Sequence, residues 1–402
     1  MRTLLFACLC LQIHPCWGQN SLDCDMTSTI RNIMETGKYN GKLRPLPNGN
    51  WSEPTEITVD LLLHSIHKID DINMELVTQF TLRSLFFLYF IILAYRKSYA
   101  HILLPPHREE WTDRRLEYNS TCLDGITLKG TDYEYIWNPD VFIINEKKSV
   151  VHDVMHRNQR MVIYPTGRIR LSTRITVVLA CPMEFSKYPF DDQTCYLTFA
   201  SYSYKIDELI FLWRTDHPPV NVVEFVMEKF NLTSYTIQSN ISVGYNKDRF
   251  QSMHVLLKFQ RKFRYYLTQI YVPTFMLVVI SWITFWLGSD SLDARIALGI
   301  TTLLTMSTSI SSFSAVQPQV AYVKAIDIYT GISMFFMVAA ILETSTVMFV
   351  GRRRNDRVID DSKKPIQFLQ KSTAERIDCL ACILFPLGYT IFNLLYFAQY
   401  FT

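Results

Sequence analysis

The sequence predicts a protein of two parts, an all-β sandwich outside the membrane followed by four membrane-spanning helices. The first observation is the distribution of charge: residues 265–351 contain only six charged residues, although 19% of all 402 residues are charged. The second is a series of short alternating runs, rich in Val, Ile, Thr, Phe and Tyr, between about 120 and 264. Because a bilayer core excludes charge more strongly than a soluble core does, we expect membrane embedding to begin near residue 265.

The chain opens with a short apolar run behind Arg2, MRTLLFACLCLQIHPCWGQN. This pattern is typical of a secretory signal peptide, so we expect residues 1–18 to be removed and residues 19–264 to form an extracellular domain. Glycosylation sequons of the form Asn-x-Ser/Thr agree with this topology because all of them precede residue 265. They lie at Asn50, Asn119, Asn231 and Asn240.

Four apolar segments follow, and each is long enough to cross roughly 30 Å of hydrocarbon as a helix. The first three are 265–287, 294–315 and 322–351, and the fourth lies in 379–402. The loop between the last two, 352–378, contains eight Lys and Arg residues. The positive-inside rule places such a loop in the cytoplasm, so both termini are expected outside the cell.

The second of these segments differs from the other three. Nine of the fourteen residues from Thr301 to Ser314 are Ser or Thr, which suits a helix that lines water better than one that faces lipid. At helical spacing Ala297, Thr301, Leu304 and Thr308 share one face. Several copies around an axis would form a polar pore with one apolar ring, and the alternative is a hydroxyl-rich packing face between helices.

The charges at the cytoplasmic end of this segment bear on ion selectivity. In GSDSLDAR, a ring of Arg295 side chains would favour anions, whereas Asp293 two residues earlier would favour cations. The alternative role for Arg295 is an interfacial anchor. The sequence alone leaves these possibilities open.

The cysteines outside the leader and the last span number four. Cys181 and Cys195 bound CPMEFSKYPFDDQTC, and we expect them to form a disulfide in an oxidising compartment. Cys24 and Cys122 could pair or stay free. The net charge of +3 gives no reason to propose a nucleic-acid partner. The sequence contains no nucleophile, metal or phosphate-loop constellation, so we expect neither an enzyme nor a cofactor or metal site.

Several motifs occur in an order that resembles the Cys-loop pentameric ligand-gated ion channels, and within them the anion-selective branch of glycine, GABA and invertebrate glutamate-gated chloride channels. They cover nearly the whole chain from about residue 30. The motifs are the Cys181 to Cys195 loop with Pro189, Asp191 and Gln193, the segment Trp137-Asn138-Pro139-Asp140, Arg261, ISWITFW, ARIALGITTLLTM, and YVKAID around Lys324.

The resemblance implies an immunoglobulin-like extracellular sandwich and a four-helix transmembrane bundle, assembled as a homo- or hetero-pentamer in the plasma membrane at a postsynaptic site. Ligand would bind between neighbouring subunits. One face of the site is implied at Phe142, Tyr202, Tyr245 and Phe250, and the other at Arg83 and Ser172. Arg is suited to a fork of hydrogen bonds to a carboxylate, which favours an amino-acid transmitter.

The resemblance also implies how binding opens the pore. Residues in or near the Cys181 to Cys195 loop would press on the linker between the second and third spans, and the Leu304 ring would open. Coupling positions implied by the family are Pro189, Phe190, Asp191, Arg261 and Lys324. The implied pore and selectivity positions are Asp293, Ala294, Arg295, Ala297, Thr301, Leu304 and Thr308.

Two departures from the family keep alternatives open. The selectivity segment is Asp293-Ala294-Arg295 where the family usually has Pro-Ala-Arg or Ala-Ala-Arg, so a cation channel of the same fold is one alternative. The stretch 84–108 separates Arg83 from Glu109 where the family continues directly. We interpret it as a retained intron or gene-model error, and the alternative is a genuine insertion in a non-conducting or assembly-modifying subunit.

Overall fold

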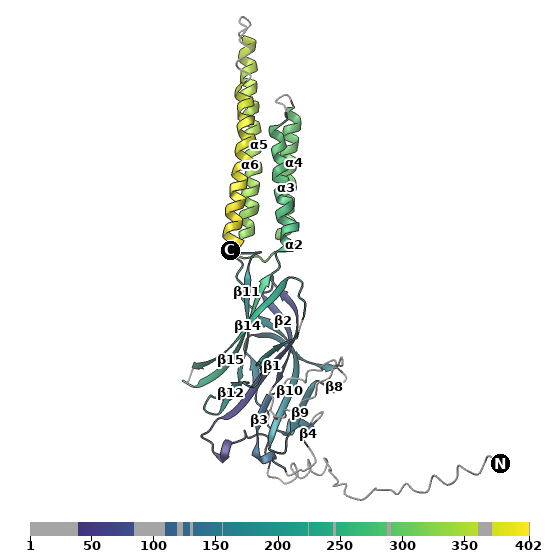
Figure 1. Ribbon diagram of the computed structural model, residues 1–402, viewed down its shortest axis with the longest axis vertical. Coiled ribbons are helices and arrows are strands. Elements are labelled where there is room, and N and C mark those ends of the chain that lie inside the picture. Colours follow the sequence, from purple (N-terminus) through teal and green to yellow (C-terminus); the bar gives the residue numbers. More distant parts are fainter. Residues whose placement is uncertain are drawn as a thin grey trace, which may run out of the picture.

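The computed structural model describes residues 39–83, 109–118, 124–128, 132–154, 156–223, 225–243, 247–287, 291–360 and 372–401. The predicted leader, Cys24 and Cys122 lie outside these ranges. The molecule is elongated, with all strands at one end and the long helices at the other (Figure 1). This order confirms the predicted fold class of a β-sandwich followed by membrane helices.

The described strands and short 3-10 helices make up the first part. Their bounds are η1 (Pro47–Gly49), β1 (Thr55–Asp70), β2 (Glu75–Arg83), β3 (Glu109–Thr112), η2 (Arg114–Leu116), β4 (Ile126–Leu128), η3 (Asp132–Tyr135), β5 (Val141–Ile143), β6 (Glu146–Val151), β7 (Asp153–Val154), β8 (His156–Arg157), β9 (Gln159–Ile163), β10 (Arg168–Ala180), β11 (Asp192–Ser201), β12 (Leu209–Trp213), β13 (Val220–Val222), β14 (Phe230–Val243) and β15 (Arg249–Arg261). One sheet has the order β12-β1-β2-β10-β9-β4, with β13 and β3 paired to β1 and β6 paired to β10. The second has the order β14-β15-β11-β5, and β7 pairs with β8.

The sandwich core follows from the alternation of side chains along the strands. In β15 every second side chain from Met253 to Phe259 is buried, whereas Lys258 and Gln260 are exposed. In the same core Trp111 of β3 meets Trp137 edge-on, with ring centroids 5.7 Å apart. Each such burial stabilises the fold by about 1.5–3 kcal/mol, so the alternating positions hold the two large sheets together.

One strand of the nine-stranded sheet is interrupted in the sequence but not in the sheet. Arg83, the last residue of β2, lies opposite Asp60 of β1, and Glu109, the first residue of β3, lies opposite Val59. Arg83 and Glu109 thus occupy consecutive positions beside β1, and β10 pairs with both strands in the same antiparallel register. The interruption coincides with residues 84–108, which lie outside the described part of the chain.

The helices form the second part. The first consists of α2 (Arg264–Tyr266), a π-helical turn η4 (Leu267–Tyr271), α3 (Val272–Trp282) and a 3-10 turn η5 (Ile283–Phe285). Pro273 lacks an N–H and excludes the carbonyl four residues earlier, which accounts for the wider turn before it. The others are α4 (Leu292–Ser314), α5 (Ala325–Asp360) and α6 (Ser372–Phe401).

Four stretches of these helices are long and apolar enough to cross a membrane. They are Arg264–Phe285, Asp293–Ser314, Ala325–Val350 and Arg376–Tyr400, which agree with the predicted spans to within a few residues. The loop predicted at 352–378 is shorter in the structure, because α5 continues to Asp360 and α6 begins at Ser372. No Gly or Pro occurs from 352 to 360, so the helix extends past the apolar run.

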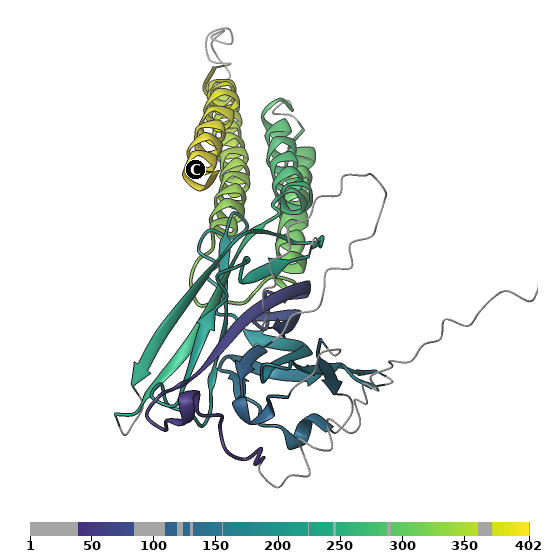
Figure 2. The ribbon, with the colours of Figure 1, turned by 60° about the horizontal axis from the view of Figure 1, so that its bottom comes forward.

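The helices run side by side away from the sheets (Figure 2), where α5 packs against α3, α4 and α6, and α3 also packs against α4. Gly299 permits a close approach of α4 to α5, since a Cβ there would lie 2.8 Å from Cγ1 of Ile341. Ser333 of α5 and Tyr389 of α6 are joined through hydroxyl oxygens 3.0 Å apart. Small side chains and hydroxyl contacts of this kind hold helices together where lipid removes the hydrophobic driving force.

Candidate functional site

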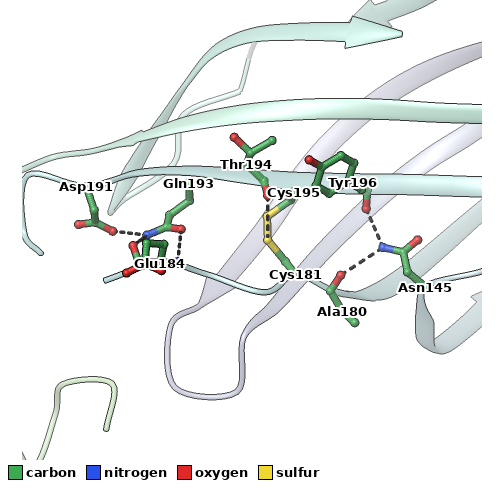
Figure 3. The surroundings of a disulfide bond; sticks show 9 residues. All are labelled: Asn145, Ala180, Cys181, Glu184, Asp191, Gln193, Thr194, Cys195 and Tyr196. Carbon is green, nitrogen blue, oxygen red and sulfur yellow. Dashed lines mark hydrogen bonds between the residues drawn. A yellow bond between two sulfur atoms is a disulfide. The ribbon is translucent and has the colours of Figure 1, made fainter. Parts of the chain in front are cut away.

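The predicted disulfide between Cys181 and Cys195 is present and joins the end of β10 to β11 (Figure 3). We call residues 181–195 the Cys loop. Inside it the Gln193 amide donates to the backbone carbonyl of Glu184 (2.7 Å) and to Oδ2 of Asp191 (2.5 Å), and its oxygen accepts from the Glu184 N–H (3.0 Å). These contacts fix the position of the Asp191 carboxylate within the loop.

Arg261, the last residue of β15, is buried beneath the Cys loop. Its Nε and Nη2 donate to the two carboxylate oxygens of Asp191 (2.7 and 3.0 Å), and Nη1 donates to Oδ2 of Asp71 (2.5 Å) and to the Tyr266 hydroxyl (3.2 Å). We call these four residues the Arg261 network. Burial alone would lower the pKa of Arg261, but the hydrogen bonds and charges of Asp191 and Asp71 raise it above its ordinary value. The network therefore joins the Cys loop and the β1–β2 turn to the first membrane helix through a permanent charge.

The Cys loop also contacts the start of α5 directly. The backbone carbonyls of Ser186 and Tyr188 accept from the N–H groups of Ala325 (3.0 Å) and Ile326 (3.2 Å). Nζ of Lys324, just before α5, lies 6.0 Å from the centroid of the Tyr188 ring. Two backbone hydrogen bonds thus join the Cys loop directly to the start of α5.

Phe190 places the tip of the Cys loop among aromatic rings of the helices. Its ring centroid lies 5.9 Å from Phe263, 5.9 Å from Tyr271 and 6.4 Å from Phe397. The peptide bond before Pro189 is cis. Because Phe397 belongs to α6, the tip packs against both the first and the last membrane helix.

The residues expected from the family to transmit gating all lie at this junction of sandwich and helices. They are Pro189, Phe190, Asp191, Arg261 and Lys324. Sequence reasoning alone misses Asp71, the second carboxylate of the Arg261 network. It lies 190 residues from its partner, and no local pattern in the sequence connects the two.

Two of the predicted ligand-binding aromatics meet on the four-stranded sheet. Phe142 of β5 and Tyr202 lie edge to face with ring centroids 5.5 Å apart, and Tyr202 is 76% exposed. Asp140 shapes the turn that presents them, since its carboxylate accepts from the Ser201 hydroxyl (2.5 Å) and from the Ser203 N–H (2.6 Å). The aromatic faces are open on the surface, where they could attract a ligand ammonium.

Two ion pairs tie the β14–β15 hairpin to the turn after β11. Lys205 lies 2.8 Å from Asp248, and Arg249 lies 2.9 Å from Asp207. The Asp248 hydrogen bond raises the pKa of Lys205. These pairs connect the hairpin of the predicted ligand site to the turn that carries Tyr202.

The remaining predicted ligand residues are divided between the two sheets. Phe250 is half-buried on β15 of the four-stranded sheet, and Tyr245 lies outside the described residues. On the nine-stranded sheet Ser172 is buried, and Arg83 ends the adjacent strand β2, although its side chain is outside the described part. The predicted ligand residues of one chain thus form two separate groups, as a site between neighbouring subunits would require.

Charged residues lie on the outer face of the nine-stranded sheet beside Ser172. Arg168 is paired with Glu110, and Nη1 of Arg214 donates to Oδ2 of Asp60 at 3.3 Å. Burial raises the pKa of Glu110 although three arginines attract its charge. This face is therefore rich in guanidinium groups and largely shielded from water.

One face of α4 is uncovered on the single chain. Leu304 is 62% exposed, whereas Met306 and Thr302 on the opposite face are buried against neighbouring helices. The exposed residues comprise the predicted pore set without Arg295, namely Asp293, Ala294, Ala297, Thr301, Leu304 and Thr308. Such a face suits a helix that lines water in an assembly of several copies.

The side chain of Arg295 is buried, whereas a ring of positive charge at the pore mouth would require it to be exposed. Its side chain is 1% exposed, and its Nη1 and Nη2 donate to the two oxygens of Asp378 in α6, both at 2.9 Å. Nε donates to the carbonyl of Leu287 at 2.9 Å. The guanidinium is therefore neutralised inside the bundle, whereas Asp293, among the described residues of this end of α4, is an exposed charge.

Three of the predicted glycosylation sites, Asn50, Asn231 and Asn240, are exposed, and Asn119 lies outside the described residues. Across the described ranges, no three His, Cys, Asp or Glu side chains are grouped as a metal ion would require. The functional features of this part of the chain are thus aromatic, cationic and hydroxyl surfaces, together with the junction at Arg261.

Comparison with known proteins agrees with this geometry. A family model described as the neurotransmitter-gated ion-channel ligand binding domain matches residues 105–263, and one described as the transmembrane region of the same channels matches residues 270–371. The chain is 36% identical over 333 residues to a glutamate-gated chloride channel of Drosophila melanogaster, covering 81% of this chain and 66% of that protein. It is a multi-pass plasma-membrane protein of a channel family, not an enzyme. The chain belongs to the Cys-loop family of neurotransmitter-gated ion channels.

Proposed function

We propose that this chain is a subunit of a pentameric channel that a small amino-acid transmitter opens and chloride crosses. The Arg261 network carries the proposal. It lies at the membrane end of β15, a strand of 13 residues whose other end forms the predicted ligand hairpin. At about 3.3 Å per residue the strand spans about 40 Å, so one rigid element connects the ligand site to the helices.

The proposed mechanism uses contacts and no covalent chemistry. Agonist between Tyr202 of one subunit and Ser172 of the next would draw the β14–β15 hairpin inward. The resulting shift of β15 would move Arg261 and, through it, the Cys loop. Since the Cys loop is bonded to the start of α5, the end of α4 would move, and the ring of Leu304 would widen and hydrate.

An amino-acid agonist is supported from two directions. Arg83 and Ser172 occupy adjoining strands, and a guanidinium with a hydroxyl is suited to a ligand carboxylate. The Drosophila relative is named for glutamate and chloride. Glutamate, GABA and glycine are therefore the proposed agonists, and a postsynaptic membrane is the proposed location.

A cation channel of the same fold is the second candidate. The observation that favours it is the pairing of Arg295 with Asp378, which leaves Asp293 as the exposed charge near the proposed pore mouth. A ring of carboxylates would attract cations and repel chloride. The two candidates therefore differ in whether the permeating ion meets the charge of Arg295 or that of Asp293.

A non-conducting or assembly-modifying subunit is a further candidate, and the interruption between β2 and β3 favours it. Arg83 and Glu109, which flank residues 84–108 in the sequence, lie in the sheet beside one half of the proposed ligand site. An apolar segment at that place would interfere with a neighbouring subunit. If it is a retained intron instead, the shorter chain would be the functional subunit.

The test is a two-electrode voltage clamp of cells that express the chain alone, with glutamate, GABA and glycine applied in turn. We expect an agonist-evoked current whose reversal potential follows chloride when external chloride is replaced. A reversal potential that follows sodium would support the cation candidate. Surface-expressed chain that gives no current with any of the three would support the non-conducting candidate.

A further inference from the structure

Glu343 of α5 is an acidic side chain inside the membrane part of the bundle. It belongs to the span Ala325–Val350, and both of its carboxyl oxygens are buried without a hydrogen-bond donor among the described residues. Burying an ionised carboxylate is costly unless it is paired, so an acid within a membrane span marks a functional position. The charge state of Glu343 therefore depends on the groups that surround it.

One guanidinium, that of Arg295 in α4, faces two carboxyl groups at this place. It attracts the charge of Glu343, but its hydrogen bonds go to other groups. Nη1 and Nη2 donate to the two oxygens of Asp378 in α6, both at 2.9 Å, and Nε and Nη2 donate to the carbonyl of Leu287 after the first membrane helix. Asp378 is therefore the carboxylate that Arg295 keeps ionised.

The carboxyl group of Glu343 lies within hydrogen-bonding reach of that of Asp378. Two ionised carboxylates in such contact repel each other, whereas a protonated carboxyl group can donate a hydrogen bond to an ionised one. A half-buried thiol, Cys382 of α6, also faces the two acids, and Cys379 lies one turn before it. We call Arg295, Asp378 and Glu343 the Arg295 cluster, which is neutral with a proton on Glu343 and negative without it.

The Arg295 cluster lies at one end of the membrane spans. Arg295 and Asp378 each come two residues after the start of a span, at Asp293 and Arg376. This is the end that the positive-inside rule assigns to the cytoplasm. The proposed pore face lies on the opposite side of α4, so a charge in the cluster, repeated in each subunit, would act on ions at the pore mouth.

We propose that Glu343 is a proton-binding site that tunes which ions the channel passes. With the proton bound, Glu343 donates to Asp378 and the Arg295 cluster is neutral. When the cytoplasm becomes alkaline, the O–H bond of Glu343 gives its proton to water, each subunit gains one negative charge beside the pore mouth, and cations are favoured over chloride. The inference rests on the proposed function for its effect on current, whereas the bound proton can be observed without any current.

The proton is observed by infrared difference spectroscopy of the purified full chain in a detergent that has no carbonyl group. On passing from neutral to alkaline pH, we expect the natural chain to lose the carbonyl stretching band of a protonated carboxylic acid. Glu343→Gln lacks this loss but keeps a neutral donor of the same shape, so it is expected to unfold at the same temperature. Cys382→Ser removes the neighbouring thiol and is the matched control, which retains the loss.

The effect on ions is measured in inside-out patches, with glutamate, GABA or glycine in the pipette and a chloride gradient across the patch. Raising the pH on the cytoplasmic side is expected to lower the chloride-to-sodium permeability ratio of the natural chain by about threefold or more, as one added charge per subunit implies. The ratio stays constant in Glu343→Gln. In Cys382→Ser it falls as in the natural chain.

A natural chain whose infrared band does not change with pH overturns the inference, as does a pH effect that survives in Glu343→Gln. A large fall in the unfolding temperature of Glu343→Gln also overturns it, because Glu343 would then be required as a charged group. If the band depends on Glu343 but none of the three transmitters evokes current, the proposed function fails and the proton site stands. If a transmitter evokes chloride current whose permeability ratio does not respond to cytoplasmic pH, the channel function stands and this inference fails.

Discussion

The guanidinium of Arg261 lies between two carboxylates that are almost completely buried. Its side chain is fully buried, and those of Asp191 and Asp71 are 2% and 5% exposed. Removing one partner of a buried ion pair leaves an uncompensated charge and costs about 3–5 kcal/mol. Here two carboxylates would lose the same partner. We therefore expect a substitution of Arg261 to destabilise the fold more than a substitution of a charged residue on the surface of the sandwich.

Arg261→Gln is therefore expected to lower the unfolding temperature and to abolish agonist-evoked current. The measurement is thermal unfolding of the detergent-solubilised protein together with surface expression. Arg264→Gln is the matched control, because Arg264 is exposed three residues later. Equal unfolding temperatures for the two variants would mean that the Arg261 network does not stabilise the junction.

The two charges at the end of α4 give a second residue-scale prediction. Arg295 is neutralised by Asp378, whereas Asp293 is exposed. Asp293→Asn is expected to move the reversal potential toward that of chloride, because it removes the negative ring that anions would meet. The measurement is reversal potential in normal and low-chloride solution. Asp327→Asn, an exposed acid at the opposite end of the spans, is expected to leave the reversal potential unchanged, and an equal shift in both variants would contradict the prediction.

At the scale of elements, the β14–β15 hairpin is held by the pairs Lys205–Asp248 and Arg249–Asp207. Exposed pairs contribute little to stability, but an ion pair that forms in only one position of the hairpin would favour that position. Lys205→Asp is expected to change agonist sensitivity severalfold, and the exchanged pair Lys205→Asp with Asp248→Lys is expected to restore it. Concentration–response curves measure both. If the double exchange is as impaired as the single change, the ion pair is not the cause.

The interrupted strand gives another prediction at this scale. Arg83 and Glu109 are consecutive in the sheet, so deletion of 84–108 joins two halves of one strand without changing its register. Closing a loop of 25 residues costs about 3 kcal/mol of chain entropy. We expect the deletion to raise the unfolding temperature and surface expression. A Gly-Ser linker of the same length separates the effect of length from that of the apolar sequence, and a deletion variant that fails to fold would show that the segment is structural.

Local patterns predict the elements better than the contacts between them. The four spans follow from charge-free apolar runs, and the disulfide follows from the Cys181 to Cys195 motif. The ends of α5 and α6 do not follow from hydropathy, because a helix continues into polar sequence until something breaks it. The sequence does not predict that Asp71 pairs with Arg261 or that Asp378 pairs with Arg295. The partners are 190 and 83 residues apart in the chain, and only folding brings them together.

At the scale of the whole molecule, the membrane helices are incompletely covered by one another. Only 17% of the span is buried in α4 and in α6, yet their uncovered surfaces differ in chemistry. The exposed side chains of α6 are mostly large and apolar, including Leu380, Ile383, Leu384, Leu387, Ile391, Leu394 and Leu395. Those of α4 include many hydroxyls. A bundle with α6 toward lipid and α4 toward a shared axis satisfies both surfaces, and several copies of the chain are needed to enclose that axis.

Leu304 tests this assembly because its proposed role exists only when the copies meet. On one chain it is an exposed leucine at the centre of a hydroxyl-rich face. In a ring it would form an apolar constriction that excludes water when closed. Leu304→Thr is expected to hydrate the closed pore, giving a standing current without agonist or opening at lower agonist concentration. Leu303→Thr makes the same change at the neighbouring position, about 100° around the helix from Leu304, and is expected to gate normally. If Leu303→Thr leaks and Leu304→Thr does not, α4 presents a different face to the axis, and the arrangement of the five helices must be rotated accordingly.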